Sequence, residues 1–106
     1  MNDLLEQINA LIDEPTGDVD RIEHTLTDGY ARAMSLEAER WRLERRIAQI
    51  AAEIESGDVA AKARELSGLA ARLDKIAADL QSLRSRLAEL RQFAETARVA
   101  VAAMAS

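Results

Sequence analysis

The chain has 106 residues, of which 48% are hydrophobic but only 3% aromatic, with one proline and no cysteine. That length suits one domain and is short for two, and the lack of cysteine excludes disulfide bonds and thiolate metal sites. The net charge of −5 at pH 7 argues against a nucleic-acid-binding protein, because such proteins normally present a basic surface.

The sequence indicates neither a signal peptide nor a membrane span. The start, Met1-Asn2-Asp3-Leu4, has no basic region followed by an apolar run. The longest apolar stretch, residues 99–105, is far shorter than the roughly 20 residues that a spanning helix needs. We therefore expect a cytoplasmic protein without membrane contact.

The first predicted helix covers residues 3–13. Asn2 or Asp3 can cap its start, and Pro15 ends it, because the residue before a proline avoids helical geometry. Its apolar side chains form one broad stripe that must be buried against other helices. These residues are Leu4, Leu5, Ile8, Leu11 and Ile12.

The second predicted helix covers residues 18–56 and begins at Asp18, a good N-cap. Apolar residues recur along it at alternating spacings of three and four, which is the coiled-coil pattern and defines a seam. Two seam positions contribute little apolar packing. Gly29 has no side chain and favours a bend or a close helix crossing, and Arg40 is charged, with its head expected to reach Glu37 or Glu44. The seam is Val19, Ile22, Leu26, Gly29, Ala33, Leu36, Arg40, Leu43, Ile47, Ile50 and Ile54.

The third predicted helix covers residues 58–104. Gly57 suits the left-handed position after a helix, and Asp58 can cap the helix that follows. The seam of this helix contains no polar residue. It consists of Leu66, Leu69, Leu73, Ile76, Leu80, Leu83, Leu87, Leu90, Ala94, Ala97, Val101 and Met104.

A short turn at Gly57 makes the second and third helices antiparallel neighbours. The predicted fold class is therefore all-α: one domain, residues 1–106, built as a long coiled-coil-like hairpin with the short first helix at its open end, a partial three-helix bundle. The third helix should extend past the second and expose Ala97, Val101 and Met104, and we expect the first helix to cover this extension.

A second apolar face predicts a partner. Tyr30, Met34, Ala38 and Trp41 share a face of the second helix that lies off the seam. Together with Phe93, Val101 and Met104 they form the predicted interface, because Trp and Tyr are enriched where proteins meet. We expect a homodimer or another protein partner, with self-association that depends on Trp41.

The flanking charges give a second, weaker indication. In a register set by Gly57, Glu23 faces Arg91 favourably. Like charges meet on the other flank, where the expected pairs are Glu39 with Asp79, Arg46 with Arg72, and Glu53 with Glu65. Like charges across a seam are destabilising. Either the register differs, or this flank is splayed and contacts another chain.

The sequence contains no pattern of catalytic or ligand-binding residues. His24, the single histidine, points away from the seam, and a di-metal carboxylate bundle needs a Glu-x-x-His pair on each of two helices. No glycine-rich phosphate loop or nucleophile set is present. We predict no enzyme activity, no catalytic or metal site, no cofactor and no small-molecule substrate.

The predicted hairpin tip carries Glu53, Glu55 and Asp58. The string Gly57-Asp58-Val59, followed by Ala63 and Glu65, resembles the turn of the Gre-type transcript-cleavage factors. The resemblance implies an acidic tip that enters an RNA polymerase channel and helps to hold a metal there. Residues 60–62, Ala-Ala-Lys, replace the acidic-asparagine pair of that family, and ordinary helix caps explain the same residues.

The function predicted from the sequence is a non-enzymatic helical interaction or scaffolding protein with coiled-coil-type contacts. One alternative is a small acidic export or assembly chaperone that binds an amphipathic client helix. The other is a transcription modulator that acts through the acidic tip.

Overall fold

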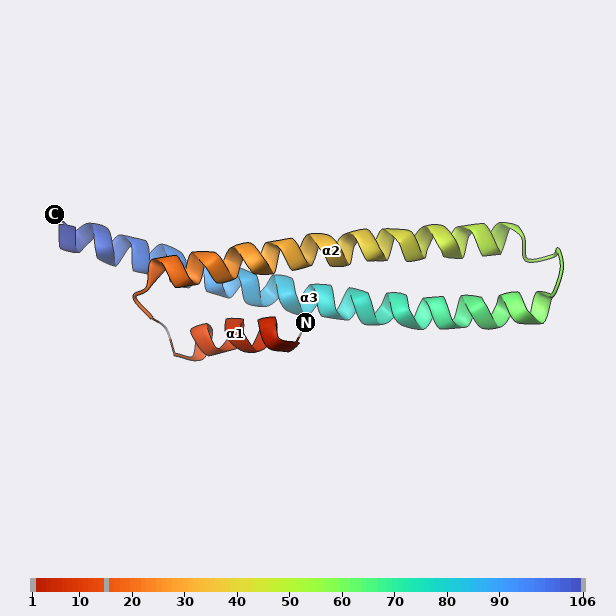
Figure 1. Cartoon of the computed structure of the whole chain (residues 1–106), viewed down its shortest axis with the longest axis horizontal. Helices are drawn as coiled ribbons and strands as arrows, with labels where there is room; N and C mark the ends of the chain where they lie inside the picture. Colours follow the sequence, from red (N-terminus) through yellow and green to blue (C-terminus); the bar gives the residue numbers. More distant parts are fainter. Residues whose placement is uncertain (1, 15, 106) are drawn as a thin grey trace. The chain divides into compact units, whose positions relative to one another are not determined.

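The computed structural model describes residues 2–14 and 16–105, with the side chain of Asn2 left out. These residues form three helices, α1 (Asn2–Asp13), α2 (Val19–Ala52) and α3 (Val59–Ala105), and the described part of the chain contains no strand (Figure 1). The all-α hairpin with a short packed N-terminal helix is therefore confirmed. The predicted stop at Pro15 and the predicted Asn2 cap lie outside the described residues.

The chain divides into two compact units. The first unit joins Met1–Met34 to Gln81–Ser106, and the second consists of Ser35–Leu80. The first unit therefore contains α1, the start of α2 and the later part of α3. The second contains the rest of α2, the link between the long helices, and the start of α3.

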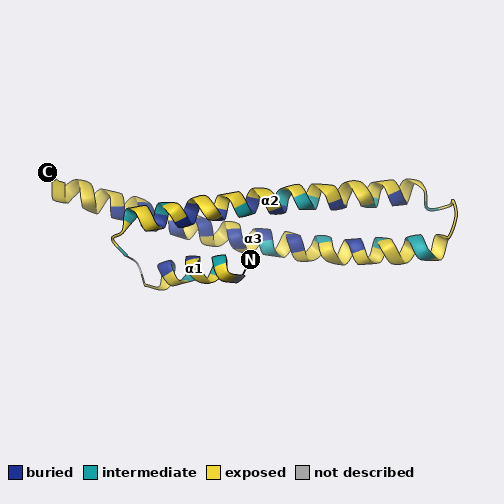
Figure 2. Ribbon diagram, viewed as in Figure 1, coloured by how far each residue is buried: buried dark blue, intermediate teal, exposed yellow. Residues whose placement is uncertain are grey.

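The first unit is a three-helix bundle, because α1 buries its apolar stripe. Ile8 and Leu11 of α1 are buried together with seam residues of α2 and α3 (Figure 2). The buried apolar residues of this unit are Ile8, Leu11, Ile22, Leu26, Ala33, Leu83, Leu87, Leu90, Ala94 and Ala97. Burial of a Leu or Ile side chain contributes about 1.5–3 kcal/mol, so α1 is held by tertiary packing rather than by its own helix propensity.

Helices α2 and α3 approach closely at Gly29. A Cβ atom added there would overlap the Cδ2 atom of Leu87 and lie 3.3 Å from its Cγ atom. The close crossing is therefore the alternative that the structure selects for this glycine, and the Leu87 side chain occupies the space that a methyl group would need.

The turn between α1 and α2 is held by a local cap. The Arg21 backbone N–H donates to Asp18 Oδ1 at 3.1 Å, and the Asp18 N–H donates to Thr16 Oγ1 at 3.2 Å. Asp18 is therefore the N-cap that the sequence predicts, and α2 begins one residue later, at Val19.

The expectation that α1 covers the extension of α3 is wrong. Ala97 is buried, whereas every described residue from Arg98 onward is exposed, with Val101 at 51% and Met104 at 87%. The reason is the direction of α1. Helix α1 runs back from the start of α2 alongside the bundle, away from the last turns of α3, and so leaves those turns uncovered (Figure 2).

The second unit is an antiparallel two-helix hairpin. Its buried residues are Leu36, Leu43, Ile50, Leu69, Ile76 and Leu80, all of which lie on the predicted seams. Arg40, the charged seam residue, remains partly exposed, and its Nε atom lies 3.8 Å from Glu44 Oε1. Glu44 is one of the two partners that the sequence predicted for it.

Helix α2 ends at Ala52, four residues before the predicted end at Ser56. The Glu53 N–H donates to the Ile50 carbonyl at 3.1 Å, and the Ser56 N–H donates to the Glu53 carbonyl at 3.0 Å, so the chain tightens into turns there. Gly57 has a φ of 73°, the left-handed conformation predicted for it. Helix α3 then begins at Val59, one residue later than expected.

The early end of α2 changes the register of the second unit. The link 53–58 is centred before Gly57, so each residue of α2 meets a residue of α3 nearer the link than expected. Arg46 pairs with Glu65 at 2.9 Å rather than facing Arg72, and Glu39 pairs with Arg72 at 3.9 Å rather than facing Asp79. The like-charge pairs predicted from the sequence are therefore wrong. This includes the pair of Glu53 with Glu65, because Glu65 pairs with Arg46.

In the first unit a predicted partner is also corrected, and there the observed partner lies farther from the link than expected. Glu23 Oε1 accepts a hydrogen bond from Arg98 Nε at 2.7 Å, whereas the sequence predicted Arg91 as its partner. Arg98 lies seven residues beyond Arg91, which is two helical turns, so both arginines present the same face of α3. The favourable sign of the pair was predicted correctly, but the partner was wrong.

Candidate interaction surfaces

The apolar residues predicted to form an interface on α2 are exposed. In the first unit these are Tyr30 and Met34, and in the second unit they are Ala38 and Trp41, whose tryptophan is 56% exposed. Because much of this large aromatic side chain is exposed to water, a partner that buried it would gain favourable hydrophobic free energy. The described residues of the second unit therefore leave Trp41 available for contact with another molecule.

Within the second unit this face is longer than the sequence reading predicted. The spacing of three and four that links Ala38 to Trp41 continues through Arg45, Ala48 and Ala52, and all five residues are exposed. We call these five positions the Trp41 stripe. Such spacing keeps side chains on one side of a helix, as in a coiled-coil seam. The pattern is readable from the sequence, but only the structure shows that this face is uncovered within its own unit.

Two arginines on this face have no carboxylate partner. The Arg45 guanidinium lies over the Trp41 ring, 4.7 Å from its centroid, in cation–π geometry. Arg42 forms no ion pair or hydrogen bond with any described residue. The nearby carboxylates of Glu39 and Glu44 are already paired with Arg72 and Arg40. The guanidinium groups of Arg42 and Arg45 are therefore not paired with a carboxylate of the described residues, although the whole chain is acidic.

The end of α3 is a second exposed apolar surface, in the first unit. Val99, Val101 and Met104 are large, apolar and exposed, and residues 99–105 contain no ionisable side chain. We call residues 99–105 the α3 end. Phe93, which the sequence placed in the same interface, is only half-exposed, so it offers less surface to a partner.

The hairpin tip is organised by local hydrogen bonds. Asp58 Oδ1 accepts the Ala61 N–H at 3.0 Å, which makes Asp58 the N-cap of α3. Lys62 Nζ donates to the backbone carbonyls of Glu53 and Ser56, a contact that sequence reasoning missed. A lysine four residues after an N-cap lies one turn into the helix, within reach of the link. The ammonium group reduces the negative character of the tip, while Glu53 and Glu55 remain exposed.

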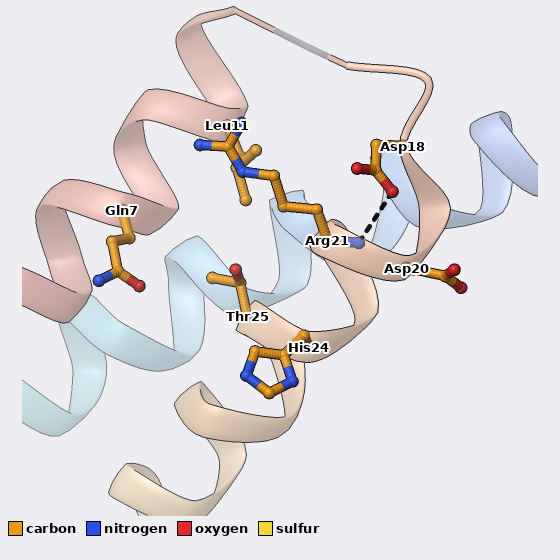
Figure 3. Close-up of a pocket in the computed structure, with 7 residues that line it drawn as sticks. All are labelled: Gln7, Leu11, Asp18, Asp20, Arg21, His24 and Thr25. Atoms are coloured by element: carbon orange, nitrogen blue, oxygen red, sulfur yellow. Dashed lines mark hydrogen bonds between the residues drawn. The ribbon is translucent and has the colours of Figure 1, made fainter.

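An open groove of about 750 Å³ lies between α1 and the start of α2 in the first unit (Figure 3). Helix α1 contributes Gln7 and Leu11 to it, and the first two turns of α2 with their cap supply the remaining residues, which are Asp18, Asp20, Arg21, His24 and Thr25. His24 is exposed, as predicted, and its Nε2 atom lies 3.8 Å from Asp28 Oδ2. The Asp18 carboxylate in this groove is engaged in capping α2, so it serves the local structure.

The described residues offer neither a metal-binding cluster nor a membrane-spanning helix. No group of three or more His, Cys, Asp or Glu side chains there is placed to hold a metal ion. None of the described helices combines the length and apolar character that crossing a bilayer requires.

Comparison with known proteins identifies no relative. No protein-family model, no curated protein and no solved structure matches the chain.

Proposed function

We propose that this chain is a non-enzymatic helical interaction protein, working in the cytoplasm as a scaffold that binds other chains through coiled-coil-type contacts. The observation that carries the proposal is the set of large apolar side chains that the helices leave exposed, in which Trp41 of α2 is the largest and Met104 of α3 is the most exposed. Exposed apolar surface of this kind is a common feature of sites where proteins meet.

We assign self-association to the α3 end. Its exposed residues carry no charge, so two copies can pair along Val101 and Met104 without bringing like charges together. The Trp41 stripe is less suited to pairing with itself, because both copies would bring Arg42 and Arg45 into the contact. The two surfaces thus support different contacts, one with a second copy and one with a different partner.

Sedimentation equilibrium over a wide range of concentrations tests self-association. We expect the wild-type mass to rise above that of the monomer and the double variant Val101→Glu, Met104→Glu to stay monomeric, because charged side chains in the contact must be desolvated. Val59→Ala is the matched control, since it removes exposed apolar atoms at the start of α3. A monomeric wild-type chain at all concentrations would remove self-association from the proposal.

Trp41→Ala belongs in the same experiment. The sequence predicted that self-association depends on this side chain, whereas the charge argument above assigns it to another partner. A fall in mass for Trp41→Ala, with the Val101 and Met104 variant unchanged, would place the contact between copies on α2 instead.

Binding of a client helix, as an export or assembly chaperone does, is the second candidate function. The unpaired Arg42 and Arg45 beside Trp41 favour it, because they suit a partner of opposite charge. Action through the acidic tip gains less support, since Asp58 is used as a helix cap and Lys62 binds the carbonyls of the link.

A further inference from the structure

We propose that the Trp41 stripe binds an acidic amphipathic helix of another protein, one whose apolar residues are flanked by glutamate or aspartate. This inference rests on the proposed function only in treating the chain as a protein that binds other proteins. It adds the chemistry of the partner and the residues that recognise it. All of these residues lie in the second unit, on α2.

The shape of the stripe selects a helix as the occupant. Ala38, Trp41, Arg45, Ala48 and Ala52 repeat with the spacing that a coiled-coil partner follows, and all are exposed. The alanines let a second helix approach closely, and Trp41 supplies one large apolar contact at the centre of a small-residue surface. Docking of the apolar face of an amphipathic helix against an apolar surface is a common mode of peptide recognition.

The charge around the stripe selects an acidic partner. The Arg42 side chain flanks Trp41 and forms no ion pair with a described residue, and the Arg45 guanidinium lies over the Trp41 ring. Carboxylates on the incoming helix can satisfy both guanidinium groups without taking a partner from the chain, because Glu39 and Glu44 already have their own arginines. Complementary charge at a contact raises its specificity and the rate at which the partners meet.

The same observations disfavour the other occupants. A second copy docked through this stripe would bring arginine to both sides of the contact. A nucleic acid would meet two local cations but would be repelled by the net charge of −5 on the whole chain.

Titration with designed peptides tests the inference, and Trp41 is the reporter because it is the single tryptophan of the chain. The probes are two synthetic helical peptides of three heptads each, with leucine at the a and d positions. One carries glutamate at the e and g positions and the other carries lysine there. Neither contains tryptophan, and repulsion between the flanking charges limits pairing of each peptide with itself.

We expect the glutamate peptide to bind saturably and to move the Trp41 emission to shorter wavelength, and the lysine peptide to bind more weakly. Exposed ion pairs contribute about 0.2–1 kcal/mol each, so the double variant Arg42→Gln, Arg45→Gln should lose roughly 2- to 30-fold in affinity for the glutamate peptide. Arg64→Gln is the matched control, because Arg64 is exposed in the same unit but lies on α3. Circular dichroism checks that each variant keeps its helical content.

Several outcomes would overturn the inference. Equal affinity for both peptides, or equal losses in the Arg42/Arg45 variant and the Arg64 control, would show that charge does not select the partner. Tighter binding of a single-stranded oligonucleotide of similar length would assign the stripe to nucleic acid. If Trp41 responds to neither peptide, the stripe is not a helix-binding site, whereas self-association through the α3 end is judged independently by sedimentation.

Discussion

Two glycines inside the long helices make a matched pair for testing the packing of α2 against α3. Gly29 faces Leu87 so closely that an added methyl group would overlap it, whereas a Cβ atom at Gly68 would meet nothing within 4 Å apart from the nearby backbone of its own helix. We predict that the same substitution, glycine to alanine, destabilises the protein at Gly29 and stabilises it at Gly68.

The magnitudes follow from two opposing effects. Alanine in place of a glycine in a helix interior is worth about 0.5–1 kcal/mol in favour of folding, and this is the whole effect expected at Gly68. At Gly29 the same gain is opposed by overpacking, which typically costs about 1–3 kcal/mol when the neighbour is confined. Leu87 is confined, since it is almost fully buried. The net effect of Gly29→Ala is therefore a loss of roughly 0.5–2 kcal/mol.

Thermal unfolding followed by circular dichroism measures both variants at one low protein concentration. For a chain of this size, 1 kcal/mol changes the Tm by about 4 °C. Gly68→Ala should raise the Tm by roughly 2–4 °C, and Gly29→Ala should lower it by roughly 2–8 °C. A gain in Tm for Gly29→Ala equal to that for Gly68→Ala would refute the close approach of the two helices at Leu87.

A second background separates crowding from any other effect at Gly29. Leu87→Ala alone should cost about 2–5 kcal/mol, because it empties a buried site. In that background the Gly29→Ala change meets no Leu87 side chain, so it should become stabilising. If the change remains destabilising there, the cause is not the contact with Leu87.

The remaining predictions concern the packing of α1, the cap of α3 and the register of the second unit. Ile8→Ala should lower the free energy of unfolding in urea by about 2–5 kcal/mol, because Ile8 is completely buried; a neutral result would mean that α1 does not pack as described. Asp58→Ala should cost about 1 kcal/mol by removing the acceptor of the Ala61 N–H, and Asp58→Asn should restore most of the loss. In a double-mutant cycle, Arg46→Gln and Glu65→Gln should show a favourable coupling of about 0.2–1 kcal/mol, and zero coupling would contradict the observed register.

The fold class was predictable because its signals are local. Spacings of three and four place Leu43 and Ile50 on one face of α2, and Leu83 and Leu87 on one face of α3, whatever lies opposite. Asp18 and Gly57 mark helix ends through their own local preferences. Secondary structure, the starts of α2 and α3 to within one residue, and most of the core therefore followed from the sequence alone.

The register of the hairpin was not predictable in the same way. It depends on where α2 ends, and the end moved to Ala52 because backbone hydrogen bonds tighten the turn after it. A seam that repeats every seven residues is satisfied equally well by a shift of seven, so the apolar pattern does not distinguish Arg46 facing Arg72 from Arg46 facing Glu65. The charges distinguish them, and in the folded protein they pair with opposite signs.

The candidate interaction surfaces were likewise predictable from the sequence only in part. The sequence by itself determined that Trp41 and Met104 lie on apolar faces of their helices, because helical periodicity alone assigns a residue to a face. Only the tertiary structure decided which faces stay open, since that depends on the direction in which α1 folds back and on which arginines find carboxylates. Burial and charge pairing are properties of neighbours in space, and a single helix's sequence does not contain its neighbours.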